Sequence, residues 1–190
     1  MNMFKILQAP NPVLSQQAKH VAKIDKSIQQ LLEQMEETLD HATDPEGVGL
    51  AAPQIGKSLQ LFIVRESPDA PLLTFINPKI ESTFDQPAQK KLANEPEAKE
   101  KKGVQLEGCL SLKDIWGVVQ RKYGVVLSYQ DEHGTKHHKK FDGFLATILQ
   151  HECDHLQGFL FTKRVLEQKN ELYHSVKNSK GEVEFEEINI

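Results

Sequence analysis

The residues His151-Glu152-Cys153-Asp154-His155 have the types and the spacing of a metal site. On an α-helix four residues turn through about 400°, so His151 and His155 would lie on one face, roughly 40° apart. Two imidazole nitrogens placed in this way can bind one metal ion. Glu152 would lie beside that ion, where its carboxylate could take a proton from water without being a ligand. The alternative is a solvated helix face with two ordinary histidines.

The residues that flank the motif predict a helix. Asp142 is suited to the N-cap position, and Gly158 is suited to the position just after a helix end. Phe144 and Ile148 begin an apolar stripe that continues into the two histidines at helical spacing. The sequence therefore predicts a largely buried helix whose histidines point inward.

A catalytic metal site usually has three protein ligands and one open position, so a third ligand must come from elsewhere. In one common metalloprotease pattern it is a histidine six residues after the second, but Phe161 stands there. The carboxylates of Glu167 and Glu171 and the thiolate of Cys109 are the remaining candidates. Cys153 would point away from the histidines and is interpreted as a small buried apolar residue. The residues alone leave this choice open.

Length, charge and cysteine content restrict the class of protein. With 190 residues the chain is predicted to form one domain. Its net charge of −4 argues against non-specific nucleic-acid binding. The sequence has no apolar run of membrane-spanning length and no signal-peptide pattern, and its two cysteines do not suggest a disulfide framework. We therefore expect a cytoplasmic protein that binds neither membranes nor specific nucleic-acid sequences.

Residue periodicity predicts one more helix and several strands. An apolar stripe with Asp25 as its cap predicts a helix at residues 25–43. Strands are predicted at residues 59–66, 72–80, 124–130 and 135–141, the last two as a hairpin. Three histidines in or beside this hairpin are predicted to be exposed: His133, His137 and His138.

Three other segments are predicted to be irregular or variable. Residues 47–56 form a loop of small residues, whose glycines would let the backbone approach a substrate closely. This loop lacks the Lys-Ser/Thr pair of a phosphate loop. Residues 85–102 are rich in Lys, Glu, Ala, Gln and Pro and are predicted to be a flexible surface insertion. Residues 167–190 are predicted to hold a short helix and an edge strand near residues 183–185.

Three motifs in this order resemble those of the peptide deformylase family. They are Gly47-Val48-Gly49-Leu50-Ala51-Ala52-Pro53-Gln54, Glu107-Gly108-Cys109-Leu110-Ser111 and His151-Glu152-Cys153-Asp154-His155. The resemblance extends from about Phe4 to Arg164. It implies an α+β fold in which mixed or antiparallel sheets pack around a central metal-binding helix that carries the H-E-x-x-H motif.

The resemblance also implies the metal ligands. Cys109, His151 and His155 would bind one divalent metal, with water in the fourth position. The metal in similar proteins is typically Fe²⁺, and Zn²⁺, Ni²⁺ or Co²⁺ can replace it. Ligand type alone would suggest zinc, so the residues do not decide between these metals.

The same resemblance implies a reaction and a substrate. Glu152 would take a proton from the water and pass it to the leaving amine. The Gln54 side chain and the Leu110 backbone N–H would stabilise the oxyanion of the tetrahedral intermediate. The substrate would be the N-formyl-methionyl end of a newly synthesised polypeptide, and the products would be formate and a free amine.

Further residues would bind the methionine or support the ligands. By resemblance, Val48, Phe144 and Ile148 would line the pocket for the substrate methionine, and Gly49 would also bind the substrate. Asp154 would orient a ligand or hold the helix in place, and by resemblance its partner would be Arg121.

The chain also departs from the family pattern. Leu112-Lys113 stand where the cysteine motif often continues with Val or Ile and then Pro. Trp116 occupies a position near the pocket rim at which many bacterial relatives carry arginine. These differences could change the preference for residues after the methionine. The tail lacks the basic helix through which some relatives dock on the ribosome, so only a transient ribosome contact is expected.

Two alternatives come from other classes of protein. A zinc endopeptidase would use Glu167 or Glu171 as its third ligand and would keep its metal when Cys109 is replaced. A non-catalytic peptide-binding protein would keep the fold without turnover. The presence of Gln54, Cys109 and Glu152 together argues against this second alternative.

Overall fold

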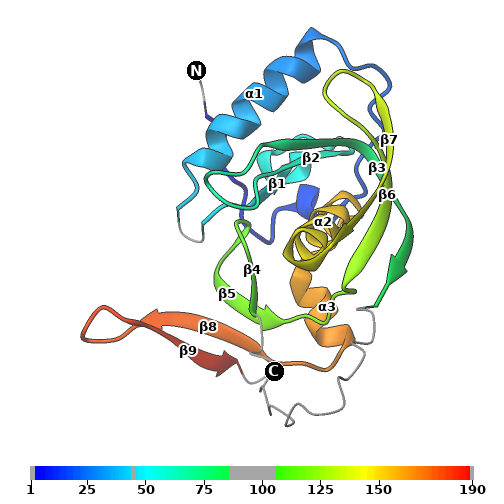
Figure 1. The fold of residues 1–190 in the computed structure, drawn as a ribbon. Helices are drawn as coiled ribbons and strands as arrows, with labels where there is room; N and C mark the ends of the chain where they lie inside the picture. Colours follow the sequence, from blue (N-terminus) through cyan, green and yellow to red (C-terminus); the bar gives the residue numbers. More distant parts are fainter. Residues whose placement is uncertain (1–2, 44–45, 86–105, 189–190) are drawn as a thin grey trace.

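The computed structural model describes residues 3–43, 46–85 and 106–188, which form three α-helices, two short 3₁₀ helices and two antiparallel sheets (Figure 1). Apart from Asp85, the predicted insertion at residues 85–102 lies outside these ranges. The elements in chain order are η1 (Pro12–Ser15), α1 (Lys26–Asp40), β1 (Gly49–Ala51), η2 (Ala52–Ile55), β2 (Leu61–Val64), β3 (Leu73–Phe84), β4 (Leu106–Cys109), β5 (Leu112–Val118), β6 (Gly124–Gln130), β7 (Lys136–Asp142), α2 (Gly143–Leu156), α3 (Phe161–Glu167), β8 (Leu172–Lys177) and β9 (Val183–Ile188).

Helix α1 begins where its capping residue predicts. The Asp25 carboxylate accepts hydrogen bonds from the backbone N–H groups of Ser27 and Ile28, at 3.0 and 3.4 Å. The helix ends at Asp40, three residues before the predicted end. Its apolar stripe packs against β1 and β2, so the helix covers one side of the larger sheet. The buried apolar members of the stripe are Ile28, Leu31, Leu32, Met35 and Leu39.

The larger sheet has the strand order β1-β2-β3-β6-β7. The predicted loop at residues 47–56 is wrong, because Gly49–Ala51 pairs with β2 as an edge strand and η2 follows it directly. Leu50 and Ala51 are fully buried, so this segment is closely packed in the protein interior. The predicted strands at residues 59–66 and 72–80 are confirmed as β2 and β3, although β3 continues to Phe84.

The predicted hairpin is confirmed, with β6 and β7 in continuous register from Gly124↔Asp142 to Gln130↔Lys136. The prediction that all three nearby histidines are exposed is wrong for His137. Its imidazole lies 2.7 Å from an Asp131 carboxylate oxygen and stacks on Tyr129, which leaves the side chain 23 % exposed.

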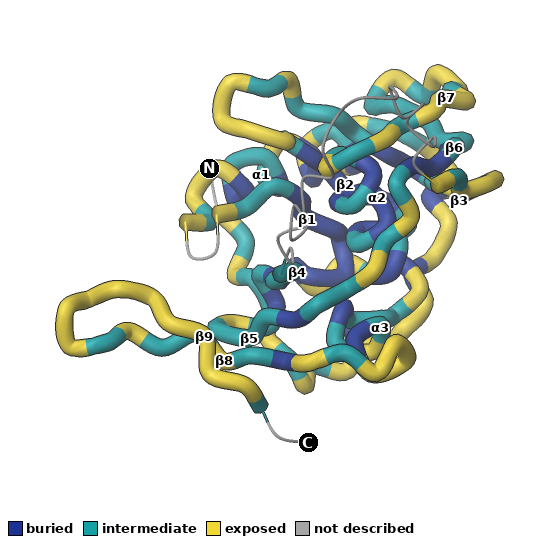
Figure 2. Tube along the Cα trace, turned by 60° about the horizontal axis from the view of Figure 1, so that its bottom comes forward, coloured by how far each residue is buried: buried dark blue, intermediate teal, exposed yellow. Residues whose placement is uncertain are grey.

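The smaller sheet has the order β4-β5-β8-β9. Strand β5 has no counterpart in the prediction, and the short helix expected in the tail is wrong, because the tail forms β8 instead. The predicted edge strand near residues 183–185 is confirmed as β9. Together β8 and β9 form a hairpin, residues 172–188, that projects from the body and carries a largely exposed loop (Figure 2). This hairpin is called the β8–β9 arm below.

Helix α2 carries the histidine motif and packs against β1, β2, β6 and β7. Asp142 occupies the N-cap position and Gly158, with φ of +75°, follows the helix end, as predicted. The prediction that the whole apolar stripe is buried is wrong for Phe144. Its side chain lies in the first turn of the helix and is 43 % exposed. No helix in the described ranges combines the length and apolar character required to cross a membrane.

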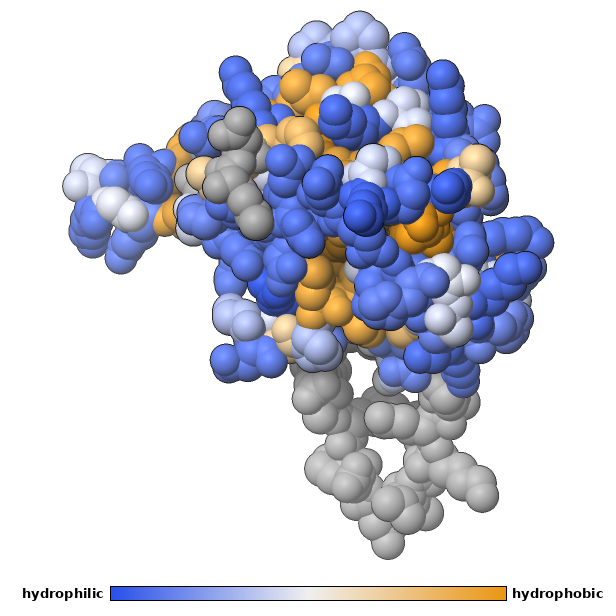
Figure 3. Space-filling view, turned by 90° about the horizontal axis from the view of Figure 1, so that it is seen from above, coloured by the Kyte–Doolittle hydropathy of each residue, from blue (hydrophilic) through white to orange (hydrophobic). Residues whose placement is uncertain are grey.

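On the face drawn in Figure 3 the surface is mostly hydrophilic, with hydrophobic residues gathered in small patches. The apolar interior instead divides into three clusters. Two of them lie on either side of the larger sheet, and the third joins α3 to the smaller sheet. Helix α2 packs on the larger sheet and reaches the smaller one through side-chain contacts with β4. Polar residues of α2 are also buried, including Gln150, Glu152, Asp154 and His155.

Candidate metal centre

Three potential ligand atoms converge between β4 and α2. The Cys109 Sγ and His151 Nε2 atoms each lie 3.2 Å from His155 Nε2, and all three ligand atoms lie within 4.8 Å of one another. A tetrahedral ion with bonds of about 2.0–2.1 Å to nitrogen and 2.3 Å to sulfur requires donor separations of roughly 3.3–3.6 Å. Burial lowers the pKa of His155 well below its ordinary value, so this imidazole is neutral, as a metal ligand must be. The donor set therefore fits a divalent metal.

The other ligand candidates lie elsewhere. Glu167 forms an ion pair with Arg164 at 3.0 Å, and Glu171 is exposed. Cys153 belongs to α2 and is half-buried against the core, where burial raises the pKa of its thiol. Among the residues that the structure describes, only Cys109 joins the two histidines in a metal-sized group.

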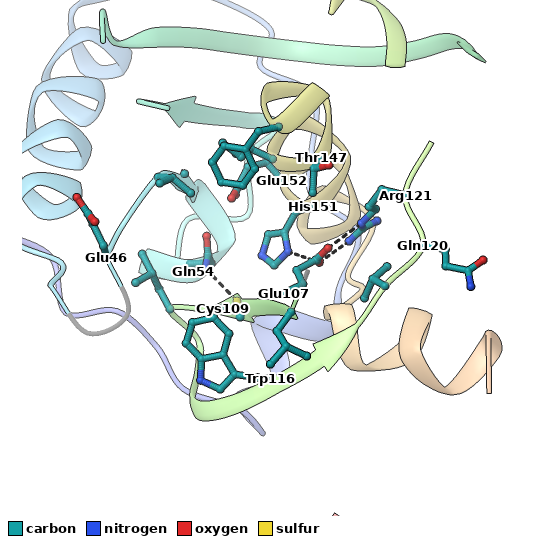
Figure 4. A pocket seen from close by; sticks show the side chains of 18 residues that line it. Glu46, Gln54, Glu107, Cys109, Trp116, Gln120, Arg121, Thr147, His151 and Glu152 are labelled. Carbon is teal, nitrogen blue, oxygen red and sulfur yellow. Dashed lines mark hydrogen bonds and ion pairs between the residues drawn. The ribbon is translucent and has the colours of Figure 1, made fainter. Parts of the chain in front are cut away.

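Glu107 orients the first histidine, a role that the sequence analysis missed. Its carboxylate accepts a hydrogen bond from His151 Nδ1 at 2.6 Å, which leaves Nε2 facing the other ligand atoms (Figure 4). Arg121 donates two more hydrogen bonds to the same carboxylate, at 2.7 and 3.0 Å. Burial opposes the charged form of Glu107, but the hydrogen bonds outweigh it and lower its pKa to about 2. One signal was available: Glu107 precedes Cys109 by two residues in a strand, which places both on one face.

Asp154 extends this group of charges toward α3. The predicted contact with Arg121 is present, with Nη1 donating to Asp154 at 2.6 Å. Arg164, which the sequence analysis did not single out, donates to both oxygens of Asp154 at 2.7 and 3.1 Å. The side chains of Glu107, Arg121 and Asp154 are only 8–11 % exposed. The result is a buried charge network that joins β4, α2 and α3 behind the ligand atoms.

Replacing Arg121 by methionine should lower the free energy of unfolding by about 3–5 kcal/mol, because Glu107 and Asp154 would then lose a buried partner. Urea denaturation of the metal-free protein measures this loss. Lys122→Met is the matched control, since Lys122 pairs with Asp85 at the surface and its loss should cost less than about 1 kcal/mol. Equal destabilisation by the two substitutions would contradict the assignment of a buried network.

Gln54 points its amide nitrogen at the ligand group. Its Oε1 accepts a hydrogen bond from the Ala51 backbone N–H at 2.8 Å, which fixes the orientation of the amide. Its Nε2 then lies 3.3 Å from Ser111 Oγ and 3.6 Å from Cys109 Sγ. Leu110 follows the cysteine directly, and its carbonyl accepts a hydrogen bond from Gln8 at 2.8 Å.

Glu152 faces the same space from α2. Its side chain is buried, and burial raises the pKa of its carboxyl group to about 7. Its Oε2 has no hydrogen-bond partner among the described residues. A Cβ atom at Gly49 would lie 2.4 Å from Glu152 Oε1, so the glycine backbone packs directly against the carboxylate. A buried acceptor without a protein partner is available to a ligand or to water.

A cavity of about 470 Å³ opens beside these groups, a size typical of small-ligand sites. It lies between β1 and β4, which within the described ranges are edge strands of the two sheets. All four residues predicted to bind the substrate line this cavity: Val48, Gly49, Phe144 and Ile148. Trp116 and Thr147 line it as well.

Comparisons with known proteins agree with this geometry. Residues 3–171 match the family model described as "Polypeptide deformylase". The chain is 37 % identical to peptide deformylase 1 of Bacillus cereus, over 90 % of this chain and 99 % of that protein. It is 38 % identical to the peptide deformylase of Synechocystis sp., over 80 % of this chain and 74 % of that protein. The crystal structure of peptide deformylase from Thermotoga maritima matches with a TM-score of 0.72 and 32 % identity, covering 87 % of this chain and 99 % of that one.

Proposed function

The chain belongs to the polypeptide deformylase family, and from this premise we propose which of its residues carry out the family's reaction. That reaction is the metal-dependent hydrolysis of the formyl group from an N-terminal formylmethionine, which releases formate. One observation supports the assignment of the catalytic residues. Three potential ligand atoms converge beside a cavity that a buried carboxylate also lines. Residues 1–190 act as one catalytic domain, and the protein meets newly synthesised polypeptides in the cytoplasm.

Cys109, His151 and His155 would hold one divalent metal ion. The donor separations and the neutral His155 support this assignment. When bound, the metal supplies Lewis acidity that lowers the pKa of a water molecule from about 15.7 toward 7. From the resemblance to the family we assign Fe²⁺ as the native metal, with Zn²⁺, Ni²⁺ or Co²⁺ able to replace it. The mixed thiolate and imidazole donors do not by themselves decide between these metals. Glu107 holds the ring of His151 in the tautomer that leaves Nε2 free.

Glu152 acts as the general base and then as the general acid. Its Oε2 has no protein partner among the described residues and is therefore free to accept a proton from water. A carboxyl group whose pKa is raised toward neutrality by burial can both accept and return a proton at physiological pH. The proton passes to the amine of the methionine as the C–N bond breaks.

The Gln54 side chain and the Leu110 backbone N–H stabilise the oxyanion. The hydrogen bond from Ala51 to Gln54 Oε1 turns the amide N–H groups toward the site, so no reorganisation is needed during the reaction. Leu110 lies next to the ligand Cys109 and lines the cavity. Each donor is worth about 3 kcal/mol of transition-state stabilisation in comparable enzymes.

The methionine side chain lies against Val48, Phe144 and Ile148, whose apolar surfaces line the cavity. Gly49 contributes backbone only, which lets the substrate chain come close to β1. Because β1 and β4 flank the cavity as edge strands of the described sheets, their backbone groups can pair with an extended peptide.

The test is formate release from formyl-Met-Ala by anaerobically purified, Fe²⁺-loaded protein. We expect formate from this peptide and no acetate from acetyl-Met-Ala, since a methyl group replaces the hydrogen of the formyl group. Absence of formate from protein shown to hold its metal would overturn the proposal. Cleavage of internal peptide bonds instead would support the endopeptidase alternative.

Gly49→Ala should lower kcat/KM for formyl-Met-Ala by about 10²-fold, because the new methyl group would displace the Glu152 carboxylate by at least an ångström. Metal content should stay unchanged, since Glu152 is outside the ligand group. Gly181→Ala is the control: its position in the arm loop has a φ of +80°, which makes the substitution unfavourable for the backbone, but no atom lies within 4 Å of the added Cβ. Unchanged activity of Gly49→Ala would show that Glu152 tolerates displacement.

A further inference from the structure

The β8–β9 arm brings an aromatic side chain to the rim of the cavity. Phe185 on β9 contacts the ring of Trp116 edge-on, with ring centroids 5.8 Å apart and planes at 80°. Trp116 lines the cavity, whereas Phe185 is 46 % exposed. The arm also lies just beyond the family match, which ends at residue 171. The contact therefore joins a hairpin that lies outside the family match to the predicted substrate site.

Strand pairing shows which face of the small sheet meets the cavity. Residues directly opposite one another on antiparallel strands share a face, and Trp116, Tyr173 and Glu187 are in register across β5, β8 and β9. Phe185 lies two residues from Glu187 and is therefore on the same face. The opposite face carries Leu172 and Ile188 and packs toward α3. The aromatic pair consequently lies on the side of the sheet that faces the cavity.

Trp116 connects the arm with the ligand group. It pairs with Gly108 across β4 and β5, and a Cβ atom at Gly108 would lie 2.8 Å from the indole ring. The ring thus lies directly on the Gly108 backbone, next to the ligand Cys109 (Figure 4). Phe185 contacts the same ring from the arm. The two rings form an apolar surface that begins beside the Gly108 backbone and extends to the arm, which we call the aromatic shelf.

We propose that the aromatic shelf, Trp116 and Phe185, binds the side chain of the third or fourth substrate residue, counted from formylmethionine. This rests on the proposed function. A peptide that pairs with the edge of β4 runs along that strand, so its third and fourth residues lie roughly 7 and 10 Å beyond formylmethionine, at about 3.4 Å per residue. The shelf begins at Trp116, one strand spacing of about 4.8 Å from β4. The shelf favours apolar and aromatic side chains, and the carboxylate of Glu187 on the same face disfavours acidic ones.

Four formylated peptides test the proposal: formyl-Met-Ala, formyl-Met-Ala-Ala-Ser, formyl-Met-Ala-Phe-Ser and formyl-Met-Ala-Ala-Phe. In Phe185→Ala, kcat/KM for at least one Phe-containing peptide should fall about threefold to tenfold, mainly through KM. The dipeptide and the Ser peptide should change less than about twofold. Val183→Ala is the matched control, because Val183 is exposed on the same strand and face, and it should leave all four peptides within about twofold.

Intrinsic fluorescence gives a second readout that does not depend on turnover. Trp116 is the only tryptophan in the chain, so a fluorescence change on adding peptide reports directly on the shelf. In metal-loaded Glu152→Gln protein, the favoured Phe peptide should change the emission and bind more tightly than the Ser peptide. Adding Phe185→Ala should remove that difference in affinity.

The outcomes separate this inference from the proposed function. Formate release from all peptides with equal effects of Phe185→Ala would overturn the shelf and leave the deformylase assignment intact. The same holds if fluorescence does not distinguish the Phe and Ser peptides. Lack of formate release from any peptide would overturn the proposed function instead, and the fluorescence titration would still decide whether peptides bind the shelf.

Discussion

Glu152→Gln should lower kcat for formyl-Met-Ala by about 10²–10⁴-fold while the metal content stays at the wild-type level. The amide has the shape of the carboxyl group but cannot accept a proton from water. Glu152 lies outside the three-atom ligand group, so its replacement removes no ligand. Steady-state formate release and metal analysis of the purified variant measure the two effects.

Asp142→Asn is the control for this substitution. Asp142 occupies the N-cap position of the same helix without a capping hydrogen bond from its side chain, and its replacement also converts a carboxylate to an amide. It should leave kcat within about twofold. A Glu152→Gln protein that retains turnover would show that another group accepts the proton, and one that loses its metal would show that Glu152 helps to bind it.

Cys109→Ser should weaken metal binding by more than about 100-fold, since removing a direct ligand should cost at least as much as removing a group that only orients one. The neutral hydroxyl of serine is a far poorer ligand at pH 7 than a thiolate. Competition with a chelator, followed by metal analysis, gives the change in affinity. Formate release should fall in parallel.

Cys153→Ser makes the same chemical change at the only other cysteine of the chain, which is half-buried and outside the ligand group. It should retain the metal. If Cys109→Ser also retained full metal affinity, the thiolate would not be a ligand, and a carboxylate such as Glu171 would have to be reconsidered.

Elements with strong local signals were predictable. Asp25 marks a helix start because capping is a local interaction, and Asp142 stands at the N-cap position of α2 as predicted, although its side chain makes no capping hydrogen bond. The β6–β7 hairpin follows from alternation on both sides of a turn. Strand β5 escaped prediction because Lys113-Asp114 and Gly117 interrupt its alternation, and Asp114 adopts a positive φ of +61°. The short strand β1 looked like a loop because burial by α1 and α2, not propensity, holds it.

The candidate site likewise contains residues that the sequence predicts and residues that only the fold brings together. The two histidines follow from spacing within one helix, whereas assigning Cys109 needed the resemblance to a family, because β4 and α2 are far apart in sequence. Glu107 was missed for that reason: its partner His151 lies 44 residues away. Arg164 was missed because surface arginines are common and only the fold places this one on Asp154.

The buried charge network also constrains how this protein is itself synthesised. The three proposed metal ligands have left the ribosome once residue 155 has emerged, but Arg164 follows in α3 and completes the pairing of Asp154. Until then Asp154 has only Arg121 as a guanidinium partner among the described residues. The second guanidinium partner of Asp154 therefore becomes available only when α3 has been synthesised, after the rest of the buried charge network.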